Sequence, residues 1–85
     1  MNQVLQRCVY QLGTDEQANF IADISGMKGE VREMYLMFHD GKKEREICHA
    51  LGIEHDAFQI IESTVRTKFL MGVFDCVLFR MNYGK

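Results

Sequence analysis

Residues 44–58 read EREICHALGIEHDAF, and this stretch decides the fold. A short apolar pattern with helical spacing ends at Leu51, and Gly52 follows, where a chain can turn with positive φ. The small Cys48 stands where two helices would touch, and a second apolar pattern brings in Phe58. Two helices joined by a short glycine turn are typical of a helix-turn-helix.

Helical apolar spacing appears on both sides of this stretch, and no segment alternates as a strand would. The patterns predict helices near residues 4–12, 14–24, 30–39 and 44–51, then from residue 55 to beyond residue 69. The last of these is either one long helix or two helices separated by a kink at Gly72. Thr14 and Gln17 have capping-box spacing, and Gly41 is placed to end a helix. We therefore expect a single all-α domain (1–85): a tri-helical helix-turn-helix core (motif about 44–69), N-terminal helices and a long apolar C-terminal helix.

Composition and cysteine usage restrict the class of protein. Apolar residues make up 47% of the chain, including six Phe and six Met, which favours a partner that covers part of the surface. The net charge of −2 argues mildly against indiscriminate nucleic-acid binding. Three widely spaced cysteines fit buried thiols in a reducing compartment. We expect a cytoplasmic protein without a signal peptide or membrane span, because the apolar run from Phe69 to Phe79 is short and contains Asp75.

The segment before the glycine turn extends the pattern. Glu33 to Gly41 reads EMYLMFHDG, Glu46-Ile47 follows, and Leu51-Gly52-Ile53 forms the turn. Together they resemble the helix-turn-helix of LuxR/GerE-type regulators, and the spacing from residue 33 to residue 69 matches without a gap. The run QIIE at residues 59–62 resembles the recognition helix in the fourth region of primary sigma factors. These resemblances imply a transcriptional regulator whose partner is duplex DNA.

A DNA-binding role implies specific contacts. The helix that begins near His55 would enter the major groove, with Gln59 and Ser63 as further residues that face the bases. Basic side chains on neighbouring turns would contact phosphates. The predicted phosphate contacts are Lys42, Lys43, Arg45, Arg66 and Lys68.

The same helix also carries a feature that disfavours DNA. Glu54, Asp56 and Glu62 are expected on its exposed side, and carboxylates are repelled by phosphates. The alternative is a protein-interaction module on the same scaffold, such as an anti-activator that binds a regulator or RNA polymerase. The sequence leaves both alternatives open, with DNA binding favoured.

The C-terminal segment is expected to form an interface. Its apolar positions recur on one helix face, so this stripe can either fold back over the N-terminal helices or pair with a second copy. We favour a homodimer. The predicted interface residues are Leu70, Phe74, Val77, Leu78 and Met81.

Catalytic, metal and cofactor sites are not expected. Cys48 and His49 are adjacent and point about 100° apart on a helix, so they cannot form a paired set of ligands. His39 is expected at a helix end, where a cation is favoured by the helix dipole. No nucleophile–base pair or phosphate loop can be assembled, so we expect neither an enzyme nor a bound cofactor.

Overall fold

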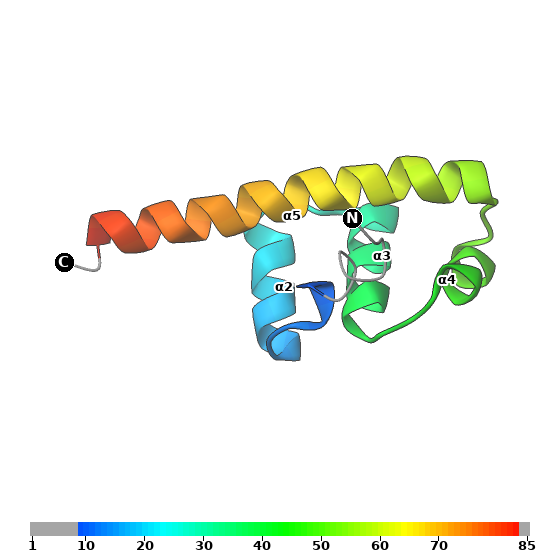
Figure 1. Cartoon of the computed structure of the whole chain (residues 1–85), viewed down its shortest axis with the longest axis horizontal. Helices are drawn as coiled ribbons and strands as arrows, with labels where there is room; N and C mark the ends of the chain where they lie inside the picture. The colour runs from blue at the N-terminus through cyan, green and yellow to red at the C-terminus, as the bar shows by residue number, and fades with distance from the viewer. Residues whose placement is uncertain (1–8, 84–85) are drawn as a thin grey trace.

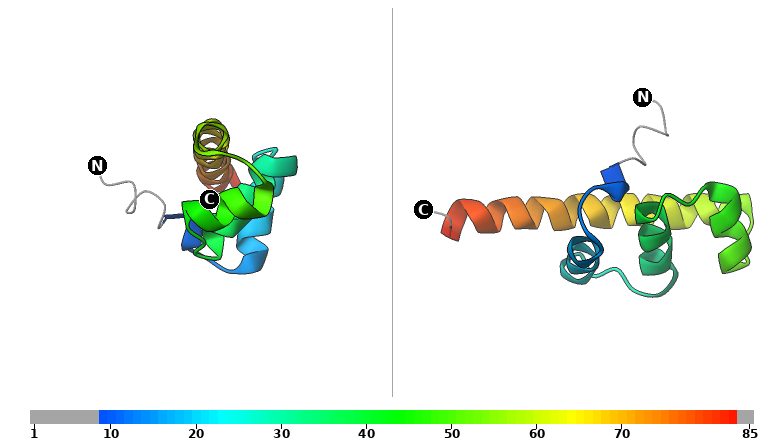
Figure 2. Two further views of the ribbon diagram at one scale, coloured as in Figure 1. Left: turned by 90° about the vertical axis from the view of Figure 1, so that its right-hand side faces the viewer. Right: turned by 90° about the horizontal axis from the view of Figure 1, so that it is seen from below.

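The computed structural model describes residues 9–83, with side chains for residues 9–74, and this part of the chain is all-helical. α5 forms a long rod, and α2, α3 and α4 lie along one side of it (Figure 1). The view along the rod shows the same one-sided arrangement (Figure 2). The elements are the 3-10 helix η1 (Val9–Gln11) and the α-helices α2 (Asp15–Ile24), α3 (Gly29–His39), α4 (Glu44–Leu51) and α5 (His55–Tyr83).

Local signals explain where the helices begin and end. The Thr14 hydroxyl accepts a hydrogen bond from the Gln17 N–H at 3.1 Å, and the Gln17 side chain accepts one from the Thr14 N–H at 2.8 Å. This reciprocal pair is the predicted capping box, and it starts α2. Gly41 follows the end of α3 with φ 83°, as expected for a glycine that terminates a helix. The predicted N-terminal helix is described only at residues 9–11, because residues 1–8 lie outside the described part.

The core lies between α5 and the helices beside it. Tyr35 and Phe38 of α3 and Phe58 of α5 are almost fully buried, and the Phe38 and Phe58 rings meet edge to face at 6.0 Å. Tyr10 of η1 closes this cluster, with its ring 5.0 Å from that of Phe69. Each such aromatic ring contributes about 1.5–3 kcal/mol by leaving water. The α3–α5 pairing therefore fixes the orientation of the first half of α5.

The C-terminal part of the prediction is confirmed at one point and wrong at another. Of the two alternatives at Gly72, one long helix is confirmed, because α5 runs without interruption from His55 to Tyr83. The long apolar C-terminal helix is wrong, because the apolar segment continues a helix whose first half exposes polar residues. Gly72 is buried because Ser25, the C-cap residue of α2, lies against it. A Cβ atom at Gly72 would stand 2.8 Å from the Ser25 Cβ. The small residue therefore permits a close helix contact.

One burial prediction fails. Glu62 was expected on the exposed side of α5, but only 8% of it is exposed. It lies three or four positions from Phe58 and Val65 and so shares their face. Among the described helices, none is long and apolar enough to cross a bilayer.

Candidate nucleic-acid interface

The connection between α4 and α5 has a fixed geometry. Gly52 adopts a left-handed conformation with φ 65° and ψ 38°, which confirms the predicted positive φ at the turn. The Ile53 N–H donates to the Cys48 carbonyl at 3.0 Å, so the last turn of α4 is closed by the chain that leaves it. Ile47 on one side and Phe58 on the other are fully buried. The angle between the two helices is therefore held by both the turn and the core.

Four of the predicted DNA-contacting residues share one face of α5. His55, Gln59, Ser63 and Arg66 are all exposed. At about 100° per residue, their positions fall within an arc of roughly 80°. This face is open to solvent because the core occupies another side of the helix, along Phe58 and its neighbours. The four side chains can therefore contact a single ligand surface.

Lys68 does not join this group. It lies about 160° around the helix from Arg66 and is half-buried. Its ammonium group lies 3.9 Å from where a Cβ atom of Gly26 would stand, beside the connection between α2 and α3. A phosphate contacted by Arg66 is therefore out of reach of Lys68 on the same face.

The basic residues around the start of α4, which were predicted to contact phosphates, are exposed. Lys42, Lys43 and Arg45 all face solvent around the first turn of the helix. Lys43 occupies the N-cap position and makes no capping hydrogen bond through its side chain. The Lys42 ammonium lies 3.8 Å from a carboxylate oxygen of Glu46, an exposed pair of small energetic value. These three cations remain available to a phosphate.

Acidic residues lie among these cations. Glu44 and Glu46 occupy the first turn of α4, and Asp56 occupies the first turn of α5. A Glu44 carboxylate oxygen lies 2.6 Å from the His55 Nδ1, so the starts of the two helices are joined through the residue predicted to face the bases. Carboxylates are stabilised at a helix N-terminus by the helix dipole, but their negative charge repels a phosphate that approaches the same place. The positive potential is therefore weaker than the number of cations suggests.

Cys48 lies in α4 beside this junction. Burial and the neighbouring Glu44 carboxylate raise the pKa of the Cys48 thiol above its ordinary value. A raised pKa keeps the sulfur protonated at neutral pH, and a thiol is a poor nucleophile. In the core, burial and the neighbouring Tyr10 raise the pKa of Tyr35 as well. Neither group therefore has the ionisation state of an activated catalytic residue.

A second polar site, which the sequence analysis missed, lies at the C-terminal end of α3. His39 is the last residue of this helix, as expected, and its ring is almost fully buried. Its Nδ1 lies 2.9 Å from the Tyr10 carbonyl, and its Nε2 lies 3.1 Å from an Asp15 carboxylate oxygen. His39 thus links η1, α2 and α3 at the edge of a shallow hollow. Only the fold could bring together residues so far apart in sequence.

The structure describes the side chains of only part of the predicted dimer stripe. Leu70 and Phe74 of the predicted dimer stripe are 60% and 62% exposed. Val77, Leu78 and Met81 lie outside the described side chains. Within the described residues, no three potential ligands from His, Cys, Asp and Glu gather in a way that could hold a metal ion.

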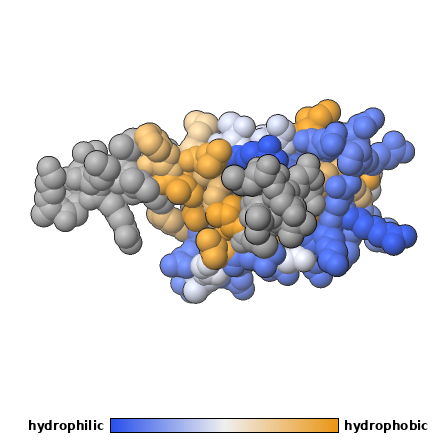
Figure 3. All heavy atoms as spheres, in the orientation of Figure 1, coloured by the Kyte–Doolittle hydropathy of each residue, from blue (hydrophilic) through white to orange (hydrophobic). Residues whose placement is uncertain are grey.

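The exposed surface is divided by hydropathy along the rod. On the face drawn in Figure 3, mainly hydrophilic side chains surround α4 and the first half of α5, with small apolar patches among them, and apolar side chains gather where α2 meets α5. The polar end contains the predicted DNA-binding face. Comparison with protein-family models, characterised proteins and solved structures finds no match to this chain. The resemblance to LuxR/GerE-type regulators therefore stays a prediction from the sequence.

Proposed function

We propose that this protein is a DNA-binding transcriptional regulator that uses α4 and α5 as a helix-turn-helix and acts as a dimer. One observation carries the proposal: His55, Gln59, Ser63 and Arg66 share an exposed polar face next to a tightly fixed turn. α3 would be the first helix of the tri-helical core, because it packs against both α4 and α5. A rigid helix with one polar face is the element that helix-turn-helix proteins insert into the major groove.

The proposal assigns different roles to the two ends of this surface. Gln59 can form paired hydrogen bonds to an adenine edge, and Ser63 one turn further along can contact either base type. Lys42, Lys43 and Arg45 would contact the phosphate backbone beside the groove, because they lie outside the α5 face. Arg66 would contact a phosphate at the far end of the same face. The cations supply affinity, and the amide and hydroxyl groups supply sequence preference.

A salt series tests this assignment. Each phosphate contact contributes about 0.9 to the slope of log affinity against log salt concentration. Lys42→Ala and Lys43→Ala should each lower that slope by nearly one and weaken binding to every sequence. Lys28→Ala is the matched control, because Lys28 is also exposed but lies before the first residue of α3, at the other end of that helix. Equal slopes for all three variants and the wild type would refute the phosphate contacts.

The base contact has a separate signature. Gln59→Ala should reduce the preference for one base pair by roughly 1–3 kcal/mol and leave the salt slope unchanged. Competition between duplexes that differ at single positions measures this preference. A loss of slope in Gln59→Ala, or an unchanged preference at all positions, would contradict a base-reading role.

A second candidate function has its own support. The acids at the starts of α4 and α5, together with Ile60, which is 70% exposed, suit a protein partner better than a phosphate backbone. On this alternative the chain binds a basic surface of a regulator or of RNA polymerase. Glu54 and Asp56, which are both exposed, would then be the sensitive positions. Their replacement by Lys should strengthen nonspecific DNA binding and abolish binding to such a partner.

A further inference from the structure

Glu44 and His55 join the first residues of α4 and α5. The His55 Nδ1 lies 2.6 Å from a Glu44 carboxylate oxygen, although the two residues are eleven positions apart in the chain. Glu44 begins α4 and His55 begins α5. The His55 side chain is 61% exposed, so this contact leaves much of the imidazole ring accessible. The pair therefore belongs to the surface that the proposed function assigns to DNA.

The contact determines which nitrogen of the His55 ring carries the proton. A carboxylate only accepts hydrogen bonds, so Nδ1 must carry the hydrogen that joins the ring to Glu44. In a neutral imidazole, one nitrogen is a donor and the other is an acceptor. Nε2 is therefore the acceptor of this ring, and it has no hydrogen-bond partner among the described residues. Its lone pair is open to a ligand.

The contact also restricts the direction in which Nε2 points. The hydrogen bond that one ring nitrogen makes sets the tautomer and the role of the other nitrogen. Here that bond comes from a neighbouring helix, and the turn at Gly52 fixes the angle between the two helices. A side chain that is already held in its binding geometry loses less entropy when it makes a contact. His55 is therefore prepared to present one acceptor in one direction.

We propose that Glu44 is a positioning residue that holds His55 in the Nδ1–H form, so that Nε2 accepts a hydrogen bond from the amino group of cytosine or adenine in the major groove. This inference rests on the proposed DNA-binding function. The N-terminal residues of a recognition helix are the ones that contact base edges, and His55 is the first residue of α5. Cytosine N4 and adenine N6 are the amino donors of the major groove, whereas guanine presents two acceptors there. A lone pair on Nε2 therefore selects against guanine.

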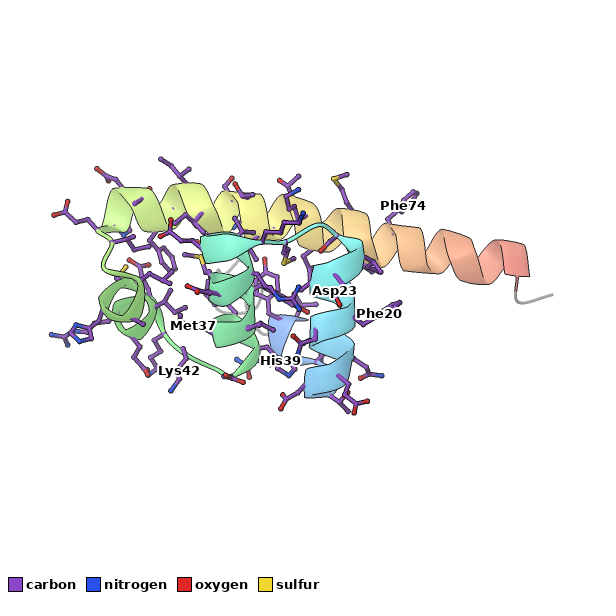
Figure 4. All side chains as sticks on the ribbon, turned by 180° about the vertical axis from the view of Figure 1, so that it is seen from behind. Phe20, Asp23, Met37, His39, Lys42 and Phe74 are labelled. Atoms are coloured by element: carbon purple, nitrogen blue, oxygen red, sulfur yellow. The ribbon has the colours of Figure 1, made fainter. Side chains whose placement is uncertain are left out.

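The other acid in the first turn of α4 has a different partner. Glu46 lies 3.8 Å from the ammonium group of Lys42, which points away from α5 (Figure 4). Loss of either carboxylate removes one negative charge beside the proposed phosphate contacts, so both variants should bind every duplex more tightly. Only the loss of Glu44 releases the His55 ring. Glu46→Ala is therefore the matched control for Glu44→Ala.

NMR of the ring nitrogens tests the position of the proton in the free protein. Proton–nitrogen spectra at about pH 8, above the ordinary pKa of histidine, distinguish the two neutral forms from the doubly protonated ring. The signals of His55 are those missing in His55→Ala. We expect the Nδ1–H form to dominate in the wild type and in Glu46→Ala, and the Nε2–H form to increase in Glu44→Ala.

His39 is the internal reference for these spectra, because it lies at the end of α3 beside α2, away from α4 (Figure 4). Its signals should be the same in all the variants. A wild-type His55 ring that is mainly Nε2–H or doubly protonated would overturn the proposal. So would a tautomer that Glu44→Ala leaves unchanged.

Selection from duplex DNA with randomised positions tests the base contact. His55 reads the position whose base preference disappears in His55→Ala. We expect cytosine or adenine at this position, preferred at least about fivefold over guanine, and the selected base identifies which amino group is bound. Glu44→Ala should lose most of this preference, whereas Glu46→Ala should keep it.

The affinity for the unselected pool separates the possible failures. A protein that binds the pool but prefers guanine at this position, or whose preference survives in Glu44→Ala, would overturn the inference alone. A folded protein that binds no duplex even at about 50 mM salt would overturn the base contact together with the proposed function.

Discussion

Gly72→Ala tests the helix contact on which the arrangement of α2 depends. In open space, replacing a glycine inside a helix by alanine stabilises the protein by about 1 kcal/mol. At Gly72 the new methyl group would stand 2.8 Å from the Ser25 Cβ and 3.5 Å from the Ile21 carbonyl oxygen. The Ser25 Cβ is attached directly to the backbone, so it cannot rotate away. Overpacking of this kind costs about 1–3 kcal/mol, and we expect a net loss of about 1 kcal/mol.

Thermal unfolding followed by circular dichroism measures this effect. A loss of 1 kcal/mol should lower the melting temperature of a domain this size by roughly 4–8 °C. Ser25→Gly removes the opposing Cβ, so Gly72→Ala should be at least 1 kcal/mol less harmful in that background than in the wild type. A Gly72→Ala protein that melts above the wild type would refute the close contact between α2 and α5.

Two further predictions concern α4. Gly52→Val should lower the free energy of unfolding by about 1–3 kcal/mol, because valine disfavours the positive φ of this residue even though the space around it is open. Gly52→Asn should cost less, because asparagine tolerates a left-handed conformation. Equal urea midpoints for the two variants and the wild type would contradict a left-handed turn. In a chain whose other cysteines are serine, Cys48 should react several-fold more slowly with thiol reagents at pH 7 than a free cysteine. Because burial and then Glu44 raise the pKa of Cys48, its labelling rate should climb with pH to a midpoint above the ordinary value, and Glu44→Gln should move that midpoint down. A wild-type midpoint at or below the ordinary value would refute the raised pKa, and an unchanged midpoint in Glu44→Gln would refute the effect of Glu44.

Local signals in the sequence were sufficient for much of the secondary structure. The capping box at Thr14 and the glycine at position 52 act over a few residues, so their effects could be predicted without knowledge of the tertiary fold. Phe58, which the sequence analysis placed in the apolar pattern after the glycine turn, is buried for the same reason: the spacing of that pattern follows the helical period. Boundaries marked by such signals needed almost no correction.

Long-range contacts explain the failures. Gly72 left a kink open as an alternative because glycine weakens an isolated helix, whereas its role is to admit Ser25, the C-cap residue of a helix almost fifty positions earlier. His39 meets Tyr10 and Asp15 through the same kind of distant contact. Glu62 is different, because its place three or four residues from Phe58 and Val65 predicts burial. The sequence-based prediction placed Glu62 on the exposed side because it is charged, and did not use this spacing.

The candidate site was predictable in outline only. The exposed face formed by His55, Gln59, Ser63 and Arg66 follows from helical spacing once the start of α5 is known. Helical spacing alone separates Lys68 from Arg66, but the sequence could not show that Lys68 lies beside Gly26 or that Glu44 reaches the His55 ring. Both depend on how α5 is rotated against the other helices. The core contacts set that rotation.

Fluorescence anisotropy of labelled random duplex DNA, titrated with the wild-type chain from about 50 to 200 mM salt, tests the central claim most directly. DNA binding through Lys42, Lys43, Arg45 and Arg66 predicts measurable affinity at the lowest salt concentration. Four contacts also predict a log–log slope near −3.6 per chain, smaller in magnitude if Glu44 and Glu46 weaken them. Absence of binding at about 50 mM salt by a folded chain would contradict the DNA-binding proposal and leave the protein-interaction module as the function of this surface.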